Sequence, residues 1–221
     1  LCLVQGLLFE KKSLLLAFEH HSAFIQIIFN PEPAEMYPSH FTSFIDTTET
    51  TELLCGAVRP VHFRGVCTVV GKLFNIVTPD RAYFGQKDAQ QLSIIRRMVR
   101  DLNFPLEICG CPIIREEDGL AKSSRNTLLS ADERAIAPKI YSALKAGKEY
   151  GATHTLKETH DKVVADINAV DGLEVEYFSI VDGNTLQEVQ SWDDSQYIAG
   201  CITVYCGKTP IRLIDHITFK E

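Results

Sequence analysis

The sequence lacks the features of a membrane-spanning or nucleic-acid-binding protein. No window approaches the roughly 18 consecutive apolar residues that a membrane span needs. Acidic residues outnumber basic ones, with 29 Asp and Glu against 22 Lys and Arg and a formal net charge of −7. No basic run is longer than the pair Arg96 and Arg97, and an acidic surface repels phosphate backbones. We therefore expect neither a membrane nor a nucleic acid as its partner.

Cysteine is present, but its spacing is not that of a metal site. The seven cysteines form no CxxC pair, and Cys109 and Cys111 are too close together for a zinc knuckle. Free thiols are typical of a reducing compartment. The apolar residues 1–8 precede Glu10 and two lysines, which is the reverse of the order in a signal peptide. These observations predict a cytoplasmic protein with no metal site of its own.

The chain does have enough apolar sequence for a folded core. Hydrophobic residues make up 45% of its 221 residues and charged residues 23%, a composition that excludes an intrinsically disordered chain. A chain of this length can form one large domain or two small ones.

Residues 25–114 alternate between strand and helix patterns. Apolar residues recur three and four apart in two segments, which predicts helices at 66–77 and 88–102. Short apolar runs predict strands at 25–29, 41–45, 81–84 and 106–108, the last continuing toward 112–114. We expect residues 59–65 to be irregular. This order of strands and helices predicts a parallel sheet of the α/β class.

The pattern changes after Ile114, where two helices are followed by strands. Ser130 and Glu133 form a capping box that opens a helix to about residue 146, and Pro138 predicts a kink within it. The other expected elements are a helix at 155–170, strands at 175–181, 197–205 and 211–219, and a hairpin turn at 206–209. We expect a separate α+β unit, with the boundary near 114–119.

The segment 84–91 lies between a predicted strand and a predicted helix. Ligands bind at this place in an open parallel sheet, and the helix that begins there offers unpaired N–H groups to an anion. Gly85 permits close approach to the backbone, Lys87 suits a phosphate, and Asp88 suits a helix cap or a ribose hydroxyl. Gln91 faces the same side one turn later. A solvated loop with Asp88 as its N-cap explains the segment equally well.

A second polar segment, residues 122–126, reads KSSRN. Two cations, Lys122 and Arg125, flank the hydroxyls of Ser123 and Ser124. Several donors that converge on one loop suit a polyphosphate, whose charge must be neutralised as a bond to phosphorus breaks. An exposed linker between domains is the alternative interpretation.

Several long motifs together resemble the pantoate–β-alanine ligase family (pantothenate synthetases, AMP-forming), from about residue 25 to the end of the chain. The motifs are YFGQKDAQQL at 83–92, IRRMVRDL at 95–102, REEDGLAKSSRN at 115–126, EMYP at 35–38, RPVHFRGV at 59–66 and RLIDHI at 212–217.

The resemblance implies a fold, a reaction and a cofactor. It implies a Rossmann-like nucleotidyltransferase domain at 1–114, which binds nucleotide and pantoate, and a smaller α+β domain at 115–221 that carries the KSSRN loop. The implied reaction joins pantoate to β-alanine through a pantoyl adenylate, with ATP and Mg²⁺, and releases AMP and pyrophosphate. Members of the family are usually homodimers through the nucleotide domain.

The resemblance also implies roles for individual residues. Lys87, Ser123, Ser124 and Arg125 would be catalytic. Gln91 would bind pantoate, and His62 would lie near the substrates. ATP would contact Gly85, Gln86, Lys87, Asp88, Ile114 (through its backbone), Lys122, Ser123, Ser124 and Arg125.

One family signature is missing from the sequence. The His-x-Gly-His motif with which the family's pattern begins does not occur, and His20 and His21 lack its glycine and spacing. We therefore expect an N-terminally truncated or divergent member, incomplete in its first domain, with residues 1–25 unmatched. Two alternatives stay open: an impaired remnant that binds nucleotide or a partner subunit, and an adenylyltransferase that uses another acid.

Overall fold

The structure is a computed structural model that describes residues 2–4, 7–10, 27–48, 54–59 and 61–221. Contacts between residues divide the chain into two compact units. The first unit consists of Leu1–Gln86 and Gln90–Cys111, and the second unit consists of Lys87–Ala89 and Pro112–Glu221. Each unit has an apolar core of its own.

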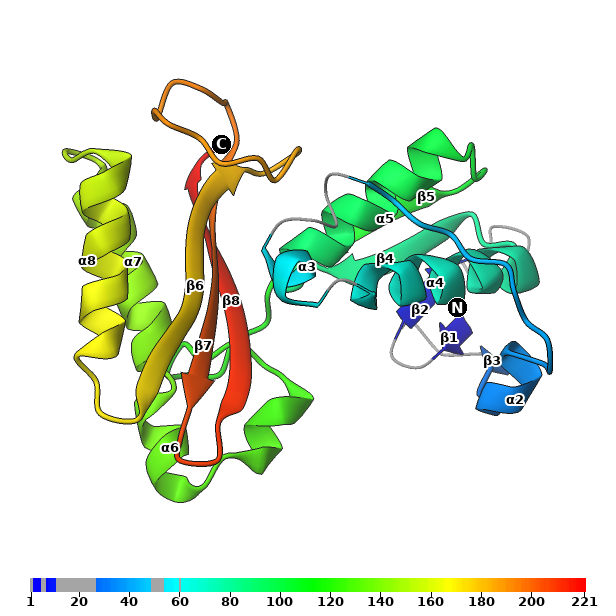
Figure 1. Ribbon diagram of the computed structural model, residues 1–221, viewed down its shortest axis with the longest axis horizontal. Coiled ribbons are helices and arrows are strands. Elements are labelled where there is room, and N and C mark those ends of the chain that lie inside the picture. The colour runs from blue at the N-terminus through cyan, green and yellow to red at the C-terminus, as the bar shows by residue number, and fades with distance from the viewer. Residues whose placement is uncertain (1, 5–6, 11–26, 49–53, 60) are drawn as a thin grey trace, which may run out of the picture. The chain divides into compact units, whose positions relative to one another are not determined.

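The described strands of the first unit form one mixed sheet (Figure 1). Strand β4 pairs in parallel with β5, and β1 pairs in parallel with β3, whereas β2 is antiparallel to both β1 and β4. The parallel sheet predicted for residues 25–114 is confirmed for β4 and β5, whereas β2 lies outside the range of that prediction. The strand order is β3 (Ile27–Ile28), β1 (Cys2–Val4), β2 (Leu7–Glu10), β4 (Arg81–Gly85) and β5 (Glu107–Cys111).

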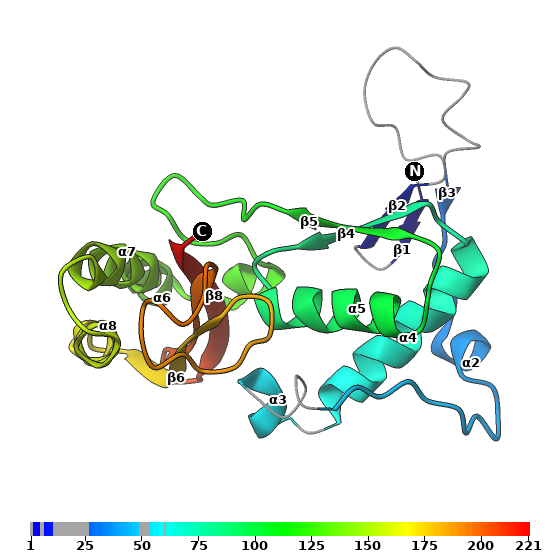
Figure 2. The ribbon, with the colours of Figure 1, turned by 90° about the horizontal axis from the view of Figure 1, so that it is seen from above.

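Helices α4 (His62–Val77) and α5 (Ala89–Asp101) cover one face of this sheet (Figure 2). Both predicted helices are confirmed. The segment expected to be irregular is already helical from His62, because Phe63 continues the apolar face of α4 into the core. Thr78 ends α4 in a left-handed conformation. The described part of this unit also contains two short helices, α2 (Pro33–Met36) and α3 (Cys55–Val58).

One strand prediction in the first half of the chain is wrong, and another extends too far. Residues 41–45 form no strand, and the N–H of Ile45 instead donates to Thr68 Oγ1 of α4 at 3.0 Å. A helix side chain thus accepts the backbone hydrogen bond that the N–H of Ile45 would have made to a neighbouring strand. Strand β5 also ends at Cys111, so residues 112–114 are not part of it. Residues 25 and 26 of the strand predicted at 25–29 lie outside the described residues.

The second unit packs two helices against an antiparallel sheet (Figure 1). The three predicted strands are present and antiparallel, and their order in the sheet is β6, β7 and β8. Pro138, where a kink within one helix was predicted, separates two helices, α6 and α7. The predicted capping box at Ser130 is confirmed, and a second one, not predicted, opens α8 at Thr155. The elements are η1 (Ser124–Leu128), α6 (Ala131–Ile136), α7 (Lys139–Gly151), α8 (Leu156–Asn168), β6 (Leu173–Asp182), β7 (Ile198–Cys206) and β8 (Ile211–Lys220).

The β7–β8 hairpin closes at the predicted turn. Gly207 has φ of +92°, which a side chain tolerates poorly, and an added Cβ there would overlap the carboxylate of Glu133. Within the described parts of the chain, no helix combines the length and the apolar content required to cross a bilayer.

The close approach of α7 and α8 depends on Gly147. A Cβ at this position would lie 2.2 Å from Cγ2 of Val163, which is fully buried on α8. Gly147→Ala should lower the free energy of unfolding by about 1–3 kcal/mol, more than the roughly 1 kcal/mol gained by removing a helical glycine. Denaturant unfolding followed by the fluorescence of Trp192, the chain's one tryptophan, measures this.

Val163→Ala supplies the control for this prediction, because it removes the atom that clashes. The double variant should lose less stability than the sum of the two single variants. If the stability losses of the two single variants simply added in the double variant, the predicted clash between positions 147 and 163 would be contradicted.

Candidate functional site

The first part of the candidate site lies where β4 and β5 end together. Gly85 pairs with Cys111 at the ends of the two parallel strands, and the N–H of Gln86 donates to the Cys111 carbonyl at 2.8 Å. A Cβ added to Gly85 would meet no atom within 4 Å. The backbone at Gly85 is therefore open, and the loop that follows leads directly into α5.

Gly110, which the sequence analysis did not single out, allows α5 to lie close to β5. A Cβ at Gly110 would be 3.0 Å from Arg96 Nη2, 3.2 Å from Leu92 Cδ2 and 3.4 Å from Gln86 Cγ. A larger residue would press on the loop at Gln86 as well as on the helix. In the Cys-Gly-Cys sequence of β5, the residue that indicates this close packing is the glycine, and the cysteines do not indicate it.

The two glutamines at the start of α5 have different environments. Gln90 is buried, and its Oε1 accepts the N–H of Cys55 at 3.0 Å, which ties α3 to α5. Gln91, the predicted substrate residue, is half-buried. His62, also predicted to lie near substrate, is the first residue of α4, and its ring centroid lies 5.0 Å from that of Phe63.

In the second unit, the KSSRN segment is a loop with a 3₁₀ turn fixed by its own side chains. Ser123 caps η1, with its Oγ accepting the N–H of Arg125 at 3.2 Å. The Nδ2 of Asn126 donates to the Ala121 carbonyl at 3.1 Å. Upstream, the N–H of Lys122 donates to the carbonyl of Ile114 at 2.9 Å, and the Ile114 side chain is 70% exposed.

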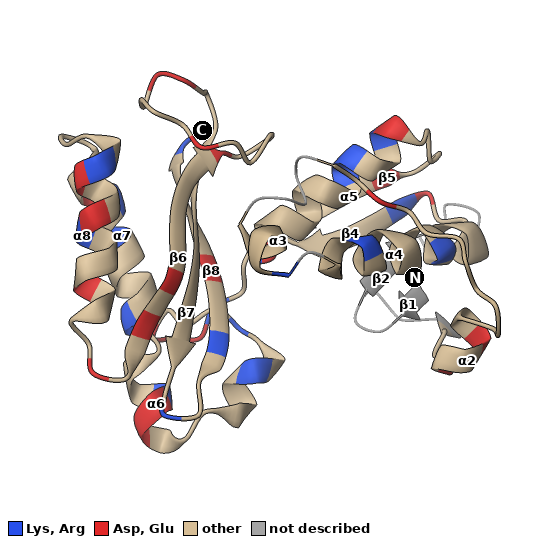
Figure 3. Ribbon diagram, viewed as in Figure 1, with Lys and Arg blue, Asp and Glu red and all other residues tan. Residues whose placement is uncertain are grey.

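Basic residues lie on η1 and on the adjoining part of β8 (Figure 3). Arg125 Nη1 donates to the backbone carbonyl of Arg212 at 3.1 Å, so one cation of the loop is bonded to β8. Lys122 is half-exposed and pairs loosely with Glu116 at 3.6 Å. In a chain with a net charge of −7, this group of cations forms a local exception that favours an anionic ligand.

Lys87 and the loop meet at a small hollow of about 10 Å³, which is room for roughly one water molecule. Its polar lining comes from Lys87, Ser123, Asn126 and Asp215, and its apolar lining from Leu120, Ala121, Ile140, Leu213 and Ile214. The structure thus brings together two residues predicted from separate motifs, Lys87 and Ser123.

The charge of Lys87 is perturbed by this position. Burial lowers the pKa of the Lys87 ammonium, the carboxylates of Asp88 and Asp215 oppose that shift, and Arg125 adds to it. Among the residues that the structure describes, none forms a hydrogen bond or ion pair with the Lys87 ammonium. A partly desolvated ammonium without a protein partner suits an anionic ligand.

An ion pair that no local sequence pattern predicts holds the start of the segment that leads into the KSSRN loop. Arg115 Nη1 and Nη2 donate to the two carboxylate oxygens of Asp215 at 2.6 and 2.9 Å, and Asp215 is only 6% exposed. The two residues are 100 positions apart, so no local pattern connects them. Both residues occur within the family motifs at 115–126 and 212–217, and this was the only indication in the sequence that they matter to the site.

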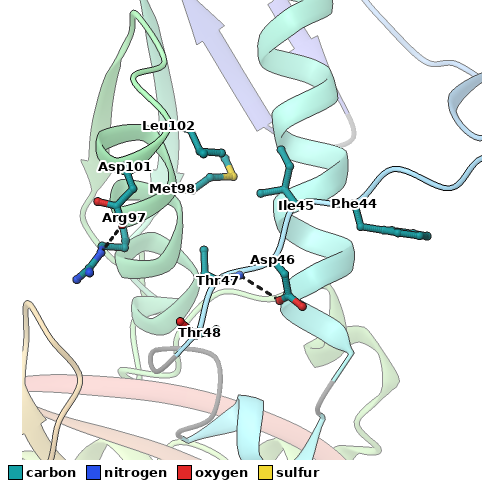
Figure 4. A pocket seen from close by; sticks show the side chains of 9 residues that line it. All are labelled: Phe44, Ile45, Asp46, Thr47, Thr48, Arg97, Met98, Asp101 and Leu102. Atoms are coloured by element: carbon teal, nitrogen blue, oxygen red, sulfur yellow. Dashed lines mark hydrogen bonds and ion pairs between the residues drawn. The ribbon is translucent and has the colours of Figure 1, made fainter.

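A larger pocket, of about 370 Å³, lies elsewhere in the first unit (Figure 4). The residues that line it are Phe44, Ile45, Asp46, Thr47, Thr48, Arg97, Met98, Asp101 and Leu102. None of the predicted site residues is among them.

Comparison with known proteins gives a consistent result. The family model for pantoate-beta-alanine ligase matches residues 16–218, so the expectation that residues 1–25 are unmatched is wrong for 16–25. The pantothenate synthetase of Bacteroides thetaiotaomicron is 54% identical over 193 residues, which are 87% of this chain and 68% of that protein. The corresponding enzyme of Enterococcus faecalis is 52% identical over 196 residues, again covering 87% and 68%.

Solved structures agree with these relatives. The crystal structure of pantothenate synthetase from Thermus thermophilus matches with a TM-score of 0.84 at 40% identity, covering 95% of this chain and 74% of that one. Pantoate-beta-alanine ligase from Francisella tularensis, complexed with beta-gamma ATP and beta-alanine, matches with a TM-score of 0.68 at 29% identity, covering 94% and 68%.

The loop's internal bonds lead to a proteolysis prediction, because trypsin can cut after Lys122 and Arg125. Ser123→Ala removes the cap of η1, a loss of about 1 kcal/mol, which increases the open population of the loop roughly fivefold. Tryptic cleavage at these two positions, followed by mass spectrometry, should accelerate accordingly.

Ser124→Ala is the matched control, because the structure describes no hydrogen bond of the Ser124 hydroxyl. Its cleavage rate should equal that of the unmodified chain. Equal rates for the two serine variants would contradict the capping role of Ser123.

Proposed function

The chain belongs to the pantoate–β-alanine ligase family, whose reaction is the ATP-dependent formation of pantothenate, and we propose that it proceeds here through a pantoyl adenylate. The observation that carries the mechanism is the position of Lys87. Its partly buried ammonium lines one hollow with Ser123 of the KSSRN loop and lacks an ion-pair partner among the described residues. A phosphate oxygen would supply that partner.

In the first proposed step, a carboxylate oxygen of pantoate attacks the α-phosphorus of ATP. The bond from that phosphorus to the bridging oxygen breaks, and pyrophosphate leaves. In the second step, the amine of β-alanine attacks the acyl carbon, the bond to the AMP oxygen breaks, and the amine releases a proton. Negative charge increases on the leaving phosphates in the first step, so fixed cations accelerate it.

The proposed roles of the residues follow from their chemistry. Lys87 and Arg125 neutralise the phosphates, and the hydroxyls of Ser123 and Ser124 donate to phosphate oxygens. Gln91 binds pantoate, and His62 lies near the substrates. The proposed ATP contacts are Gly85, Gln86, Lys87, Asp88, Ile114, Lys122, Ser123, Ser124 and Arg125.

This set of residues supplies cations and hydrogen-bond donors rather than a nucleophile with its base. An acyl adenylate forms without any covalent bond to the protein, so positioning of reactants and stabilisation of charge account for the catalysis. The donors of η1 suit this task because the loop's own bonds hold them in place before a ligand arrives.

We propose that Mg²⁺ enters the site with the phosphates of ATP. Magnesium retains several waters and is usually held by substrate phosphates with one or two carboxylates. Within the described residues, no three His, Cys, Asp or Glu side chains gather as a metal site. The ion's contribution is to neutralise charge on the phosphates.

Three broader features belong to the same proposal. The first is a Rossmann-like nucleotide- and pantoate-binding domain at 1–114, followed by a smaller domain at 115–221. The second is a homodimer formed through the first domain. The third is a cytoplasmic location, which is supported by the free thiols of Cys55, Cys67, Cys109, Cys111, Cys201 and Cys206.

Two other functions predict different products. An adenylyltransferase for another acid would exchange pyrophosphate with ATP in the presence of that acid and not of pantoate. A remnant that only binds nucleotide would bind ATP and form no pantothenate. Assays of exchange with a panel of hydroxy acids, together with detection of pantothenate, separate the three.

Lys87→Ala should abolish pantoate-dependent exchange between ATP and pyrophosphate. Removing one fixed group of this kind typically lowers the rate by about 10²–10³. Lys208→Ala, which removes an exposed lysine in the β7–β8 turn, is the control and should keep the full rate. Exchange that persists in Lys87→Ala would exclude Lys87 from the phosphate site.

A further inference from the structure

Asp215 is an almost fully buried carboxylate on β8 with every oxygen bonded. Its Oδ2 accepts from Arg115 Nη1 at 2.6 Å. Its Oδ1 accepts from Arg115 Nη2 at 2.9 Å and from the N–H of His216 at 2.8 Å. A bidentate guanidinium pair of this kind fixes the carboxylate in one orientation.

Arg115 is equally constrained. Its guanidinium carbon lies 3.5 Å from the ring centroid of Tyr141, and the group also donates to the carbonyls of Gly119 at 3.1 Å and His216 at 3.4 Å. With a stacked face and several donors in use, Arg115 has little freedom to leave Asp215. The pair is a rigid element within the second unit.

Asp215 also lines the hollow that contains Lys87, although the two are not in an ion pair. The charged groups that act on Lys87 are Asp88 from its own loop, Arg125 from η1 and Asp215 from β8. Asp88 is exposed, so water screens its charge. Asp88 raises the Lys87 pKa more than Asp215 does, but Asp215 is the buried carboxylate of the two, and its charge acts through a poorly screened interior.

We propose that Asp215 is a positioning residue for Lys87: its carboxylate, held by Arg115, keeps the ammonium charged in the hollow without drawing it into an ion pair. Without the carboxylate, the buried ammonium would tend to lose its proton. Without Arg115, the carboxylate would be free to bind Lys87 and compete with a phosphate. The pair balances these two effects.

The test measures the pKa of Lys87 directly in the full chain. Acetic anhydride acetylates only the neutral amine, so the rate of acetylation as a function of pH reports the pKa, and peptide mass spectrometry isolates Lys87. Exposed Lys208 serves as the internal reference. Asp215→Asn should lower the pKa of Lys87 and Arg115→Gln should raise it, each by about one unit.

Opposite shifts distinguish this role from a purely structural one. If the ion pair only supported the fold, both variants would shift the Lys87 pKa in the same direction or leave it unchanged, and either result would overturn the proposal. Asp118→Asn breaks the neighbouring Arg134 ion pair and should leave Lys87 unchanged. Should Asp215→Asn fail to fold, a lowered or unchanged pKa in Arg115→Gln would overturn the proposal on its own.

The consequence for catalysis rests on the proposed function of Lys87. Because the ammonium must be charged to bind phosphate, exchange activity is present below the Lys87 pKa and is lost as the pH rises through it. The alkaline limb of exchange should move to lower pH in Asp215→Asn and to higher pH in Arg115→Gln. If acetylation shows opposite shifts of the Lys87 pKa but the alkaline limb of exchange does not move, the role of Asp215 is supported and Lys87 is excluded from the phosphate site.

Discussion

The bidentate ion pair between Arg115 and Asp215 is the constraint on which the candidate site depends. It joins the residue that enters the KSSRN segment to the central part of β8, 100 positions later. Removing one partner of a buried pair typically costs about 3–5 kcal/mol, because the other charge is left without compensation. The bond from Arg115 to the carbonyl of Gly119, the cap at Ser123 and the bond from Arg125 to β8 hold the same stretch at further points. The loop that we propose to present cations to a polyphosphate is thereby held in place before a ligand binds.

Much of the fold was predictable because it follows from the local spacing of apolar residues and from helix-capping residues. The apolar positions of α4 and α5 repeat at helical spacing, and the capping boxes at Ser130 and Thr155 mark where helices begin. The failures have a different origin. The strand expected at 41–45 has the right composition, but a strand needs a neighbour, and the hydroxyl of Thr68 takes that place. No strand was predicted at β2, whose antiparallel direction depends on pairing that no local pattern contains.

The site was predictable as two segments and not as one arrangement. Residue types at 84–91 and 122–126 indicated phosphate chemistry, and the structure adds that Lys87 and Ser123 line the same hollow. The sequence contained no sign that Gln90 is structural while its neighbour Gln91 is not buried, because both lie in the same turn of α5. Arg115 and Asp215 were within recognised motifs, but their partnership is a long-range contact. Charge, glycine and hydroxyl content identify the loops, and tertiary packing decides which groups face one another.

The most direct test of the account follows the oxygen atoms of the acid. Pantoate labelled with ¹⁸O in its carboxylate is incubated with the full chain, ATP, Mg²⁺ and β-alanine, and the AMP is analysed by mass spectrometry. If pantoate is activated as an acyl adenylate, one labelled oxygen passes to the phosphate of AMP for each pantothenate formed. Unlabelled AMP, or ADP in its place, would contradict the mechanism, and the absence of pantothenate would contradict the function.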